Sequence, residues 1–430
     1  MELLPRLALV VLATVVATQV LMPFARRAGV AWGLVDHPSW RRRQKCAVPC
    51  SGGLAVYLTG VLAALALTFW IGSPFPPTAL VALGLGGLGT IVLGMLDDRF
   101  GLHAEKKLLG QVLVVSLPMA GGLTLEQIWM PGVGLVELGV LSGPITLFWY
   151  LGFINSVNLI DGLDGLAAGI VAIVAGTVLV AVHGGDPIGA LWLGAFLGTV
   201  LGFLRDNLSK HRIFLGDAGS MLLGLWVAGL VLGLSTRSPI APGIAAFAML
   251  VPVLDTATTI LRRWRRGTSI FRPDAEHIHH RLLELGTSPM RATLCLWFVT
   301  LSAASTGALV LGAPSAIVLA VAAAAGAAIE LAYTIQHDRH PGPSRVLGYL
   351  LGVHPTLVPV DPAQQLADVI EMEAYRSQRD ARRTADPAAT AEPVESAEAG
   401  AASAPSPASA PKDPVAPDDV VLALPDDPTR

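Results

Sequence analysis

Long apolar stretches separated by short polar breaks occupy the first 335 residues of the chain. A helix needs about 20 apolar residues to cross the hydrocarbon core of a bilayer. Eleven stretches approach this length, at residues 4–23, 51–71, 79–96, 108–122, 143–160, 165–182, 188–204, 218–234, 240–261, 292–312 and 315–334. Pro118 and the Gly121–Gly122 pair shorten the fourth, so ten spans is the alternative. The pattern predicts an all-α, polytopic membrane protein with about 10 or 11 transmembrane helices.

The composition fits a membrane protein better than a soluble one. Hydrophobic residues make up 53% of the 430 residues and charged residues 14%, whereas a soluble domain carries roughly a quarter charged residues. The first apolar stretch follows Glu2 and Arg6 and is long enough to span, which argues against a cleavable signal peptide. Cys46, Cys50 and Cys295 are too few for a disulfide framework, and we expect them to be thiols.

Lysines and arginines are distributed unevenly between alternate loops. Nineteen lie in one set of loops, and only Arg6 and Arg237 lie in the other. Because cytoplasmic loops carry the excess of positive charge, the first set is expected to be cytoplasmic. The N-terminus is then outside and, with eleven spans, the C-terminus is inside.

Three regions follow from this pattern. Residues 1–335 are predicted to form the transmembrane domain, and residues 336–384 a cytoplasmic segment that could be helical. Residues 385–430 are rich in Ala, Pro, Ser and acidic residues and almost lack aromatic residues. Such a composition cannot bury a core, so we predict a disordered tail.

Acidic side chains gather in the loops predicted to be cytoplasmic. A carboxylate at a membrane boundary is costly unless a cation or a hydrogen-bond donor compensates it. The first pair, Asp97 and Asp98, follows the third span, and Lys106 and Lys107 open the fourth. Adjacent carboxylates repel, so they imply a nearby cation or a raised pKa. The alternative is that they are solvated charges at a helix end.

The second cluster, Asn155-Ser-Val-Asn158-Leu-Ile-Asp161-Gly-Leu-Asp164-Gly, joins the fifth and sixth spans. On a helix Asn155 and Asn158 share a face, and the glycines let the backbone turn closely around a ligand. Oxygen donors of this kind suit magnesium, which shares its coordination shell with substrate phosphates. The spacing resembles half of a calcium loop, but the closing Glu is missing, so calcium is disfavoured.

The third cluster, Phe214-Leu-Gly-Asp217-Ala-Gly-Ser, opens the eighth span. A carboxylate between two glycines at a helix N-terminus leaves room for a phosphate or a metal–phosphate to approach the backbone N–H groups. The alternative is that Asp217 is a simple N-cap.

The fourth cluster, His277-Ile-His279-His280-Arg281, lies in the longest loop of the cytoplasmic set. It could form a zinc site or a donor-rich surface for hydroxyls and phosphates. The neighbouring arginines favour an anion over a second metal. Asp255, inside the ninth span, is a candidate for the functional site or for a hydrogen bond to a neighbouring helix.

These four motifs together closely resemble those of the polyprenyl-phosphate N-acetylhexosamine-1-phosphate transferases (glycosyltransferase family 4). The resemblance covers about residues 1–335, in order and at matching topology. His-Ile-His-His-Arg-Leu is similar to the UDP-N-acetylglucosamine-using WecA/TagO branch. The resemblance implies transfer of N-acetylglucosamine 1-phosphate from the UDP-sugar to an undecaprenyl-type phosphate, with release of UMP. The product would start cell-wall or surface polysaccharide synthesis at the bacterial plasma membrane, with the active site facing the cytoplasm.

The resemblance also implies roles for single residues and a cofactor. Asp97, Asp98 and Lys107 match the catalytic residues, with Lys107 meeting phosphate. Asp217 and Asn158 match ligands of Mg²⁺, or of Mn²⁺ in its place. The ligands of the UDP-sugar are expected to be Asp161, Asp164 and Phe214 for the uridine, and His277, His279, His280 and Arg281 for the sugar and diphosphate.

One stretch departs from the family pattern ahead of the second span. Gln44, Ala47 and Cys50 stand where relatives usually have His, Pro and Arg. If this loop holds the lipid phosphate, we expect Arg41, Arg42 or Lys45 to contact it. The departure concerns substrate detail rather than the class of reaction.

For the mechanism, Asp97 or Asp98 either removes the last proton from the lipid phosphate or attacks phosphorus itself to give a covalent intermediate. Direct attack by the lipid phosphate is favoured, because a phosphate with a second pKa near 6 is already largely ionised. The expected partners are the UDP-N-acetylhexosamine, the polyprenyl phosphate and the bilayer, without nucleic acid; a homodimer is left open. Transfer from UDP-MurNAc-pentapeptide or another UDP-N-acetylhexosamine is the alternative within the family. A transporter or lipid flippase is the alternative from another class, although the polar residues lie at one face rather than at the midplane.

Overall fold

The computed structural model describes residues 3–36, 47–209, 212–267, 269, 277–284, 287–313, 317, 320, 321 and 326. The predicted segments 336–384 and 385–430 lie outside the described residues. So do Arg41, Arg42, Lys45 and most of the predicted span 315–334.

The described residues fold almost entirely into helices. In chain order these are α1 (Leu3–Ala31), α2 (Gly52–Ile71), α3 (Pro77–Phe100), α4 (Ala104–Ala120), α5 (Ser142–Ile160), α6 (Leu166–Val182), α7 (Pro187–Asn207), α8 (Gly216–Leu234), α9 (Ala241–Ala248), α10 (Leu250–Arg265), α11 (Ile278–Glu284) and α12 (Pro289–Val310), with a 3₁₀ turn, η1 (Gly139–Leu141). Two antiparallel hairpins pair β1 (Val35–Asp36) with β2 (Val48–Pro49), and β3 (Gln127–Met130) with β4 (Gly134–Glu137).

The helices have the length and composition of membrane spans. Within the described part of the chain, seven helices can cross a bilayer, and α9 with α10 would make an eighth span bent by 58°. Helices α4 and α6, with 17 residues each, are shorter. A helix lies in each of the first ten predicted ranges. The prediction of an all-α multi-pass membrane protein is therefore confirmed.

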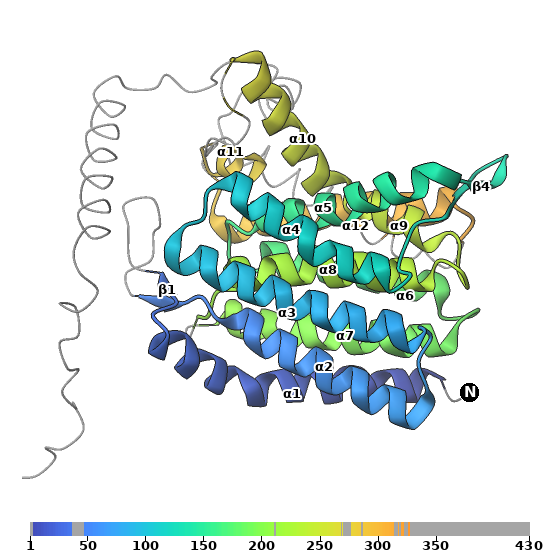
Figure 1. Ribbon diagram of the computed structural model, residues 1–430, viewed down its shortest axis with the longest axis horizontal. Helices are drawn as coiled ribbons and strands as arrows, with labels where there is room; N and C mark the ends of the chain where they lie inside the picture. The colour runs from blue at the N-terminus through green and yellow to red at the C-terminus, as the bar shows by residue number, and fades with distance from the viewer. Residues whose placement is uncertain are drawn as a thin grey trace, which may run out of the picture. The chain divides into compact units, whose positions relative to one another are not determined.

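The break in the ninth predicted span has a local cause. Helix α9 ends at Ala248, four residues before Pro252 in α10. A proline has no N–H to donate, and its ring clashes with the carbonyl four residues earlier. The chain therefore turns between the two helices, and α10 leaves the direction of the other helices (Figure 1).

Most helices run side by side, with β1 at one end of the bundle and the β3–β4 hairpin at the other (Figure 1). Helix α8 forms the centre, since almost all its residues are buried. Helices α1 and α2 instead expose large apolar side chains, such as Leu9, Leu12, Phe69 and Trp70. An apolar surface of this kind is stable against lipid acyl chains rather than water.

Small residues bring α2 and α3 very close to the first turn of α8. A Cβ atom added at Gly53 would overlap Gly219, and one at Gly94 would overlap the backbone of Ala218. Contacts between small residues are a common way for membrane helices to approach closely. They place the last turn of α3, with Asp97 and Asp98, against the beginning of α8.

Backbone hydrogen bonds also fix the segment that leads into α8. Phe214 N donates to Pro49 O over 2.9 Å, and Gly52 N donates to Phe214 O over 2.9 Å. Gly53 N donates to Leu215 O over 3.3 Å. The segment before α2, in which Ala47 and Cys50 depart from the family pattern, thus lies directly beside the beginning of α8.

Candidate active site

Lys107 lies at the centre of a polar cluster formed by α3, α4, α5 and α8. Its Nζ atom is 2.7 Å from Asp97 Oδ2 and 3.0 Å from Asp217 Oδ2. It also donates to Asn158 Oδ1 over 3.0 Å. Burial disfavours the charged form of the lysine, but the two carboxylates within 3.0 Å compensate this effect. The lysine is therefore a fixed positive charge.

Asn158 connects α5 to the first turn of α8. Its Nδ2 atom donates to Asp217 Oδ1 over 2.7 Å and to Ser220 Oγ over 2.9 Å. The hydrogen bond to Lys107 uses the amide oxygen, so both ends of the side chain are engaged. The amide thus orients the Asp217 carboxylate toward Lys107.

Asp98 holds the N-terminus of α8 from the end of α3. Its Oδ1 atom accepts from Asp217 N over 3.0 Å, and its Oδ2 atom from Ala218 N over 3.5 Å. Gly216, with a φ of 70°, makes the turn beneath this carboxylate, and only glycine adopts such a φ at little cost. Asp98 therefore fills the position of an N-cap, although it comes from another helix.

A second polar layer lies one turn away from Lys107. Gln111 Nε2 donates to Asn155 Oδ1 over 3.2 Å, and Asn155 Nδ2 donates back to Gln111 Oε1 over 2.9 Å. Gln111 is fully buried, and it follows Lys107 by four residues on α4. The reciprocal amide pair therefore fixes the register between α4 and α5 that brings Lys107 to Asn158.

The loop between α5 and α6 carries Asp161 and Asp164. Asp164 Oδ2 is 2.8 Å from Arg212 Nη1, which lies two residues before Phe214. Burial raises the pKa of the Asp164 carboxyl, and Arg212 opposes this rise. Asn207 braces the loop, because its Oδ1 atom accepts from Gly165 N over 2.6 Å and its Nδ2 atom donates to Ile213 O over 3.0 Å. The residues predicted to hold uridine therefore lie in two connected segments.

The histidine motif packs on that loop. A Cβ atom added at Gly162 would overlap the ring of His279, so His279 covers the turn between Asp161 and Asp164. The ring of His279 lies parallel to that of His277, with centroids 5.8 Å apart, and 4.2 Å from that of His280. Arg281 is buried in the same short helix, α11.

His279 is buried, with 1% of its surface exposed. Among the described residues, neither of its ring nitrogens has a hydrogen-bond partner. Burial, followed by the neighbouring His280 and His277, lowers the pKa of His279 to about 3. The ring is therefore neutral at physiological pH.

The Lys107 cluster also has the donor atoms that a magnesium ion would need. No group of three or more His, Cys, Asp or Glu side chains in the described ranges is arranged to hold a metal ion. However, oxygen atoms of Asp97, Asn158 and Asp217 lie within 3.0 Å of one cation, the Lys107 ammonium. Carboxylate and amide oxygens are the ligands that hard divalent cations prefer. The residues present therefore fit Mg²⁺ or Mn²⁺ chemically.

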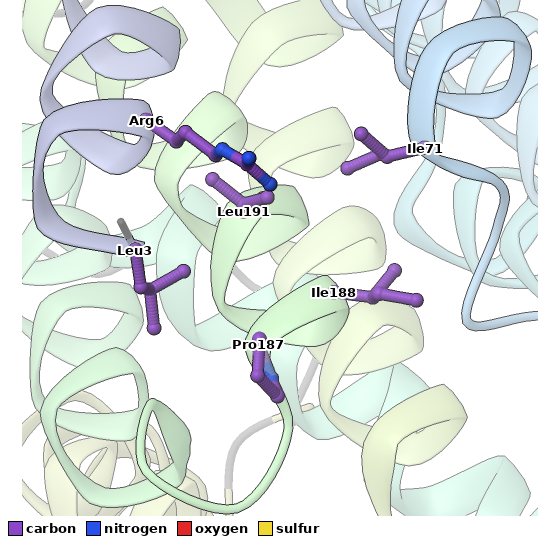
Figure 2. Close-up of a pocket in the computed structure, with 6 residues that line it drawn as sticks. All are labelled: Leu3, Arg6, Ile71, Pro187, Ile188 and Leu191. Atoms are coloured by element: carbon purple, nitrogen blue, oxygen red, sulfur yellow. The ribbon is translucent and has the colours of Figure 1, made fainter. Parts of the chain in front are cut away.

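A pocket of about 430 Å³ lies at the opposite ends of α1, α2 and α7 (Figure 2). Its lining is Leu3, Arg6, Ile71, Pro187, Ile188 and Leu191. All but Arg6 are apolar, and none belongs to the predicted site. The polar cluster, rather than this pocket, is the candidate active site.

The structure brings most of the predicted site residues together. Asp97, Lys107, Asn158 and Asp217 contact one another directly, with Asp98 beside them. Asp161, Asp164 and Phe214 adjoin this cluster along the chain, and His279 covers their loop. Arg41, Arg42 and Lys45 lie outside the described residues.

Sequence reasoning missed several residues that support the site. Ser220 bonds to Asn158, Asn207 bonds to the loop that carries Asp164, and Gln111 bonds to Asn155 of the second motif. Gln111 could have been found from the sequence, because it is a polar residue within an apolar stretch, four positions after Lys107. The role of Asn207 could not be found in this way, because it bonds to Gly165 and Ile213, which are far from each other in the sequence.

Helices of membrane-spanning length with a cluster of fixed charges at one end define a multi-pass membrane protein with a polar site. Comparison with known proteins narrows this class. Residues 80–235 match glycosyl transferase family 4. This range contains the Lys107 cluster and the Asp161–Asp164 loop, but not the histidine motif.

Three bacterial relatives illustrate the similarity. The probable undecaprenyl-phosphate N-acetylglucosaminyl 1-phosphate transferase of Bacillus subtilis (strain 168) is 33% identical over 302 residues, which are 69% of this chain and 83% of the relative. The decaprenyl-phosphate N-acetylglucosaminephosphotransferase of Mycolicibacterium smegmatis is 34% identical over 342 residues, 70% of this chain and 82% of the relative. The undecaprenyl-phosphate alpha-N-acetylglucosaminyl 1-phosphate transferase of Escherichia coli (strain K12) is 30% identical over 301 residues, which are 68% of this chain and 80% of the relative.

The chain belongs to glycosyl transferase family 4. The family predicted from the four motifs is thus confirmed.

The lowered pKa of His279 predicts a pH dependence of stability. In the unfolded chain its pKa is that of a free histidine, 6.5, so the unfolded state binds a proton that the folded state does not bind until about pH 3. Stability is therefore lost as the pH falls below 6.5, by at most about 1.4 kcal/mol per pH unit. Thermal unfolding in detergent at pH 7.5 and pH 5 should show a smaller loss for His279→Phe than for the wild type. His103→Phe, at an exposed position, is the control and should behave like the wild type; an equal loss in all three proteins would contradict the assignment.

Proposed function

We propose that the protein transfers N-acetylglucosamine 1-phosphate from UDP-N-acetylglucosamine to a polyprenyl phosphate of the undecaprenyl type. The observation that carries this proposal is the Lys107 ammonium bound by Asp97, Asn158 and Asp217 at one end of the membrane-length helices. The names of the relatives describe the same transfer to undecaprenyl or decaprenyl phosphate. The product would be a polyprenyl-diphosphate sugar that starts cell-wall or surface polysaccharide synthesis.

The reaction joins two anions, so its main requirements are positioning and charge neutralisation. An oxygen of the lipid phosphate attacks the phosphorus that carries the sugar. The bond from this phosphorus to the oxygen bridging the two phosphates breaks, and UMP leaves with that oxygen. Lys107, kept protonated by two carboxylates, supplies positive charge beside these phosphates.

Magnesium, or manganese in its place, is the proposed cofactor. Asp217 and Asn158 would hold it, with Asp97 beside them. When bound, the ion would neutralise the diphosphate and the charge that develops on the departing UMP.

The environment of the two adjacent aspartates favours direct attack by the lipid phosphate over a covalent intermediate. Both oxygens of Asp98 accept backbone N–H groups of α8. Asp97 pairs with Lys107 and accepts from Leu102 N over 2.7 Å. Neither carboxylate is a free nucleophile, whereas the lipid phosphate is largely ionised near neutral pH.

The remaining site residues would bind the rest of the UDP-sugar. Asp161, Asp164 and Phe214 would hold the uridine, with the half-buried ring of Phe214 stacking on uracil. His277, His279, His280 and Arg281 would contact the sugar and the diphosphate.

We also propose that the site faces the cytoplasm of a bacterial plasma membrane. The helix ends nearest the site, and the segment between α7 and α8, carry Arg26, Arg99, Lys107, Arg205 and Arg212. Arg6, near the beginning of α1, and Arg237, just after α8, lie at the opposite end. Positive charge marks the cytoplasmic side of membrane proteins. UDP-sugars are cytosolic, so this orientation lets the donor reach the site.

The activity is tested with purified protein, radiolabelled UDP-N-acetylglucosamine and undecaprenyl phosphate. We expect one labelled lipid product for each UMP released, only when Mg²⁺ or Mn²⁺ is present. UDP-MurNAc-pentapeptide should give no lipid product. Asp217→Asn should reduce the rate by at least about 100-fold because it removes one charge from the proposed ion site.

The matched control is Asp206→Asn, at the same end of the bundle. Asp206 bonds to Gln19 and Arg26 instead, so the variant should keep near-normal activity. Release of UMP without a lipid product would replace the proposed transferase with a hydrolase. Full activity of Asp217→Asn would remove Asp217 from the ion site.

Orientation is tested in sealed membrane vesicles, because UDP-N-acetylglucosamine does not cross a bilayer. Inside-out vesicles, which expose the cytoplasmic face, should form labelled lipid from added donor. Right-side-out vesicles should do so only after permeabilisation. The reverse pattern would place the site on the outer face.

A further inference from the structure

Asp255 is a buried carboxylate in α10 with two hydrogen-bond partners in another segment. Its Oδ2 atom lies 2.9 Å from His277 Nδ1, and its Oδ1 atom accepts from Ile278 N over 2.9 Å. The side chain is 6% exposed. One carboxylate therefore binds both the backbone and the side chain at the beginning of the histidine motif.

The contact with His277 sets the proton position on that ring. An ionised carboxylate only accepts hydrogen bonds, so Nδ1 must carry the proton. In a neutral ring Nε2 is then the acceptor. Without Asp255 either nitrogen could carry the proton, and the ring could rotate.

The ring of His277 contacts the loop proposed to bind the nucleotide through the ring of His279. The rings of His277 and His279 are parallel, with an interplanar angle of 1° and centroids 5.8 Å apart. His279 in turn covers Gly162, between Asp161 and Asp164. Asp255 is thus connected to this loop through two packed side chains, His277 and His279.

Helix α10 itself is anchored beside the Lys107 cluster. Thr256 Oγ1, next to Asp255, bonds to Ser156 Oγ over 3.3 Å, and Ser156 lies two residues before Asn158 on α5. The same part of α10 therefore contacts the helix that carries Asn158 and the motif that carries His277.

We propose that Asp255 is a positioning residue for transfer from the UDP-sugar: it fixes the proton position and the orientation of the His277 ring, which stacks on the His279 ring that covers the nucleotide loop. This inference rests on the proposed function. Asp255 itself would not contact the substrate, and its effect on turnover would pass through His277.

Asp255→Asn separates this role from a purely structural one. An asparagine oxygen can still accept from Ile278 N, and asparagine caps a helix as well as aspartate does. Its amide NH₂ group would then face Nδ1 of His277 and favour the tautomer with the proton on Nε2. The variant keeps the support of α11 and reverses the proton position.

The test compares turnover and thermal unfolding of wild type, Asp255→Asn, His277→Ala and the double variant. We expect Asp255→Asn to unfold at the wild-type temperature but to lose kcat by about 10- to 100-fold, as for other groups that orient a functional histidine. KM for the UDP-sugar should change by no more than about 3-fold. The double variant should be no slower than His277→Ala, because Asp255 acts through His277.

Thr258→Val is the local control on α10. Its hydroxyl donates to the Asp255 carbonyl within the same helix, so its loss should leave kcat unchanged. If Asp255→Asn and the wild type have equal kcat, the positioning role of Asp255 is wrong but the proposed function stands. Additive losses of kcat in the double variant would have the same consequence. If the wild type forms no lipid product, the proposed function fails, and the inference fails with it.

Discussion

The site depends on one half-buried cation, the Lys107 ammonium, and the oxygens that surround it. Lys107 brings a positive charge from α4 to side chains on α3, α5 and α8. Removal of one partner would leave the other charge uncompensated in a partly buried site, which is unfavourable. Each carboxylate therefore requires the lysine, and the lysine requires the carboxylates. This mutual dependence holds four helix ends at one place.

The close approach of α3 to α8 makes that meeting possible. The small residues Gly94 and Ala218 let the two backbones touch, and Asp98 then reaches the free N–H groups at the beginning of α8. The carboxylate that resembles a catalytic group in the sequence thus holds the helix that presents Asp217. A similar arrangement recurs at the histidine motif, where Asp255 binds the backbone at the beginning of α11.

Much of this was predictable from the sequence, and the rest was not for physical reasons. Apolar stretches located the helices. Polar residues at their ends, together with the resemblance to the family, pointed to Asp97, Lys107, Asn158 and Asp217, which lie together in the structure. Pro252 was an available signal for the break between α9 and α10. The partners of Asp98 and Asp255 were not predictable, because they are set by helix packing between segments 119 and 22 residues away. Periodicity within one helix carries no information about such contacts.

The most direct test of this account is the rate of UMP release by Lys107→Gln compared with Lys106→Gln. The two lysines are adjacent on α4, but Lys106 is exposed and Lys107 is bound by three side chains. With both variants folded, as judged by gel filtration, the account predicts a loss of at least about 100-fold for Lys107→Gln, the cost of removing one fixed charge from a phosphate site. Lys106→Gln should remain near the wild-type rate. Equal rates for the two variants would contradict the central role of the Lys107 charge.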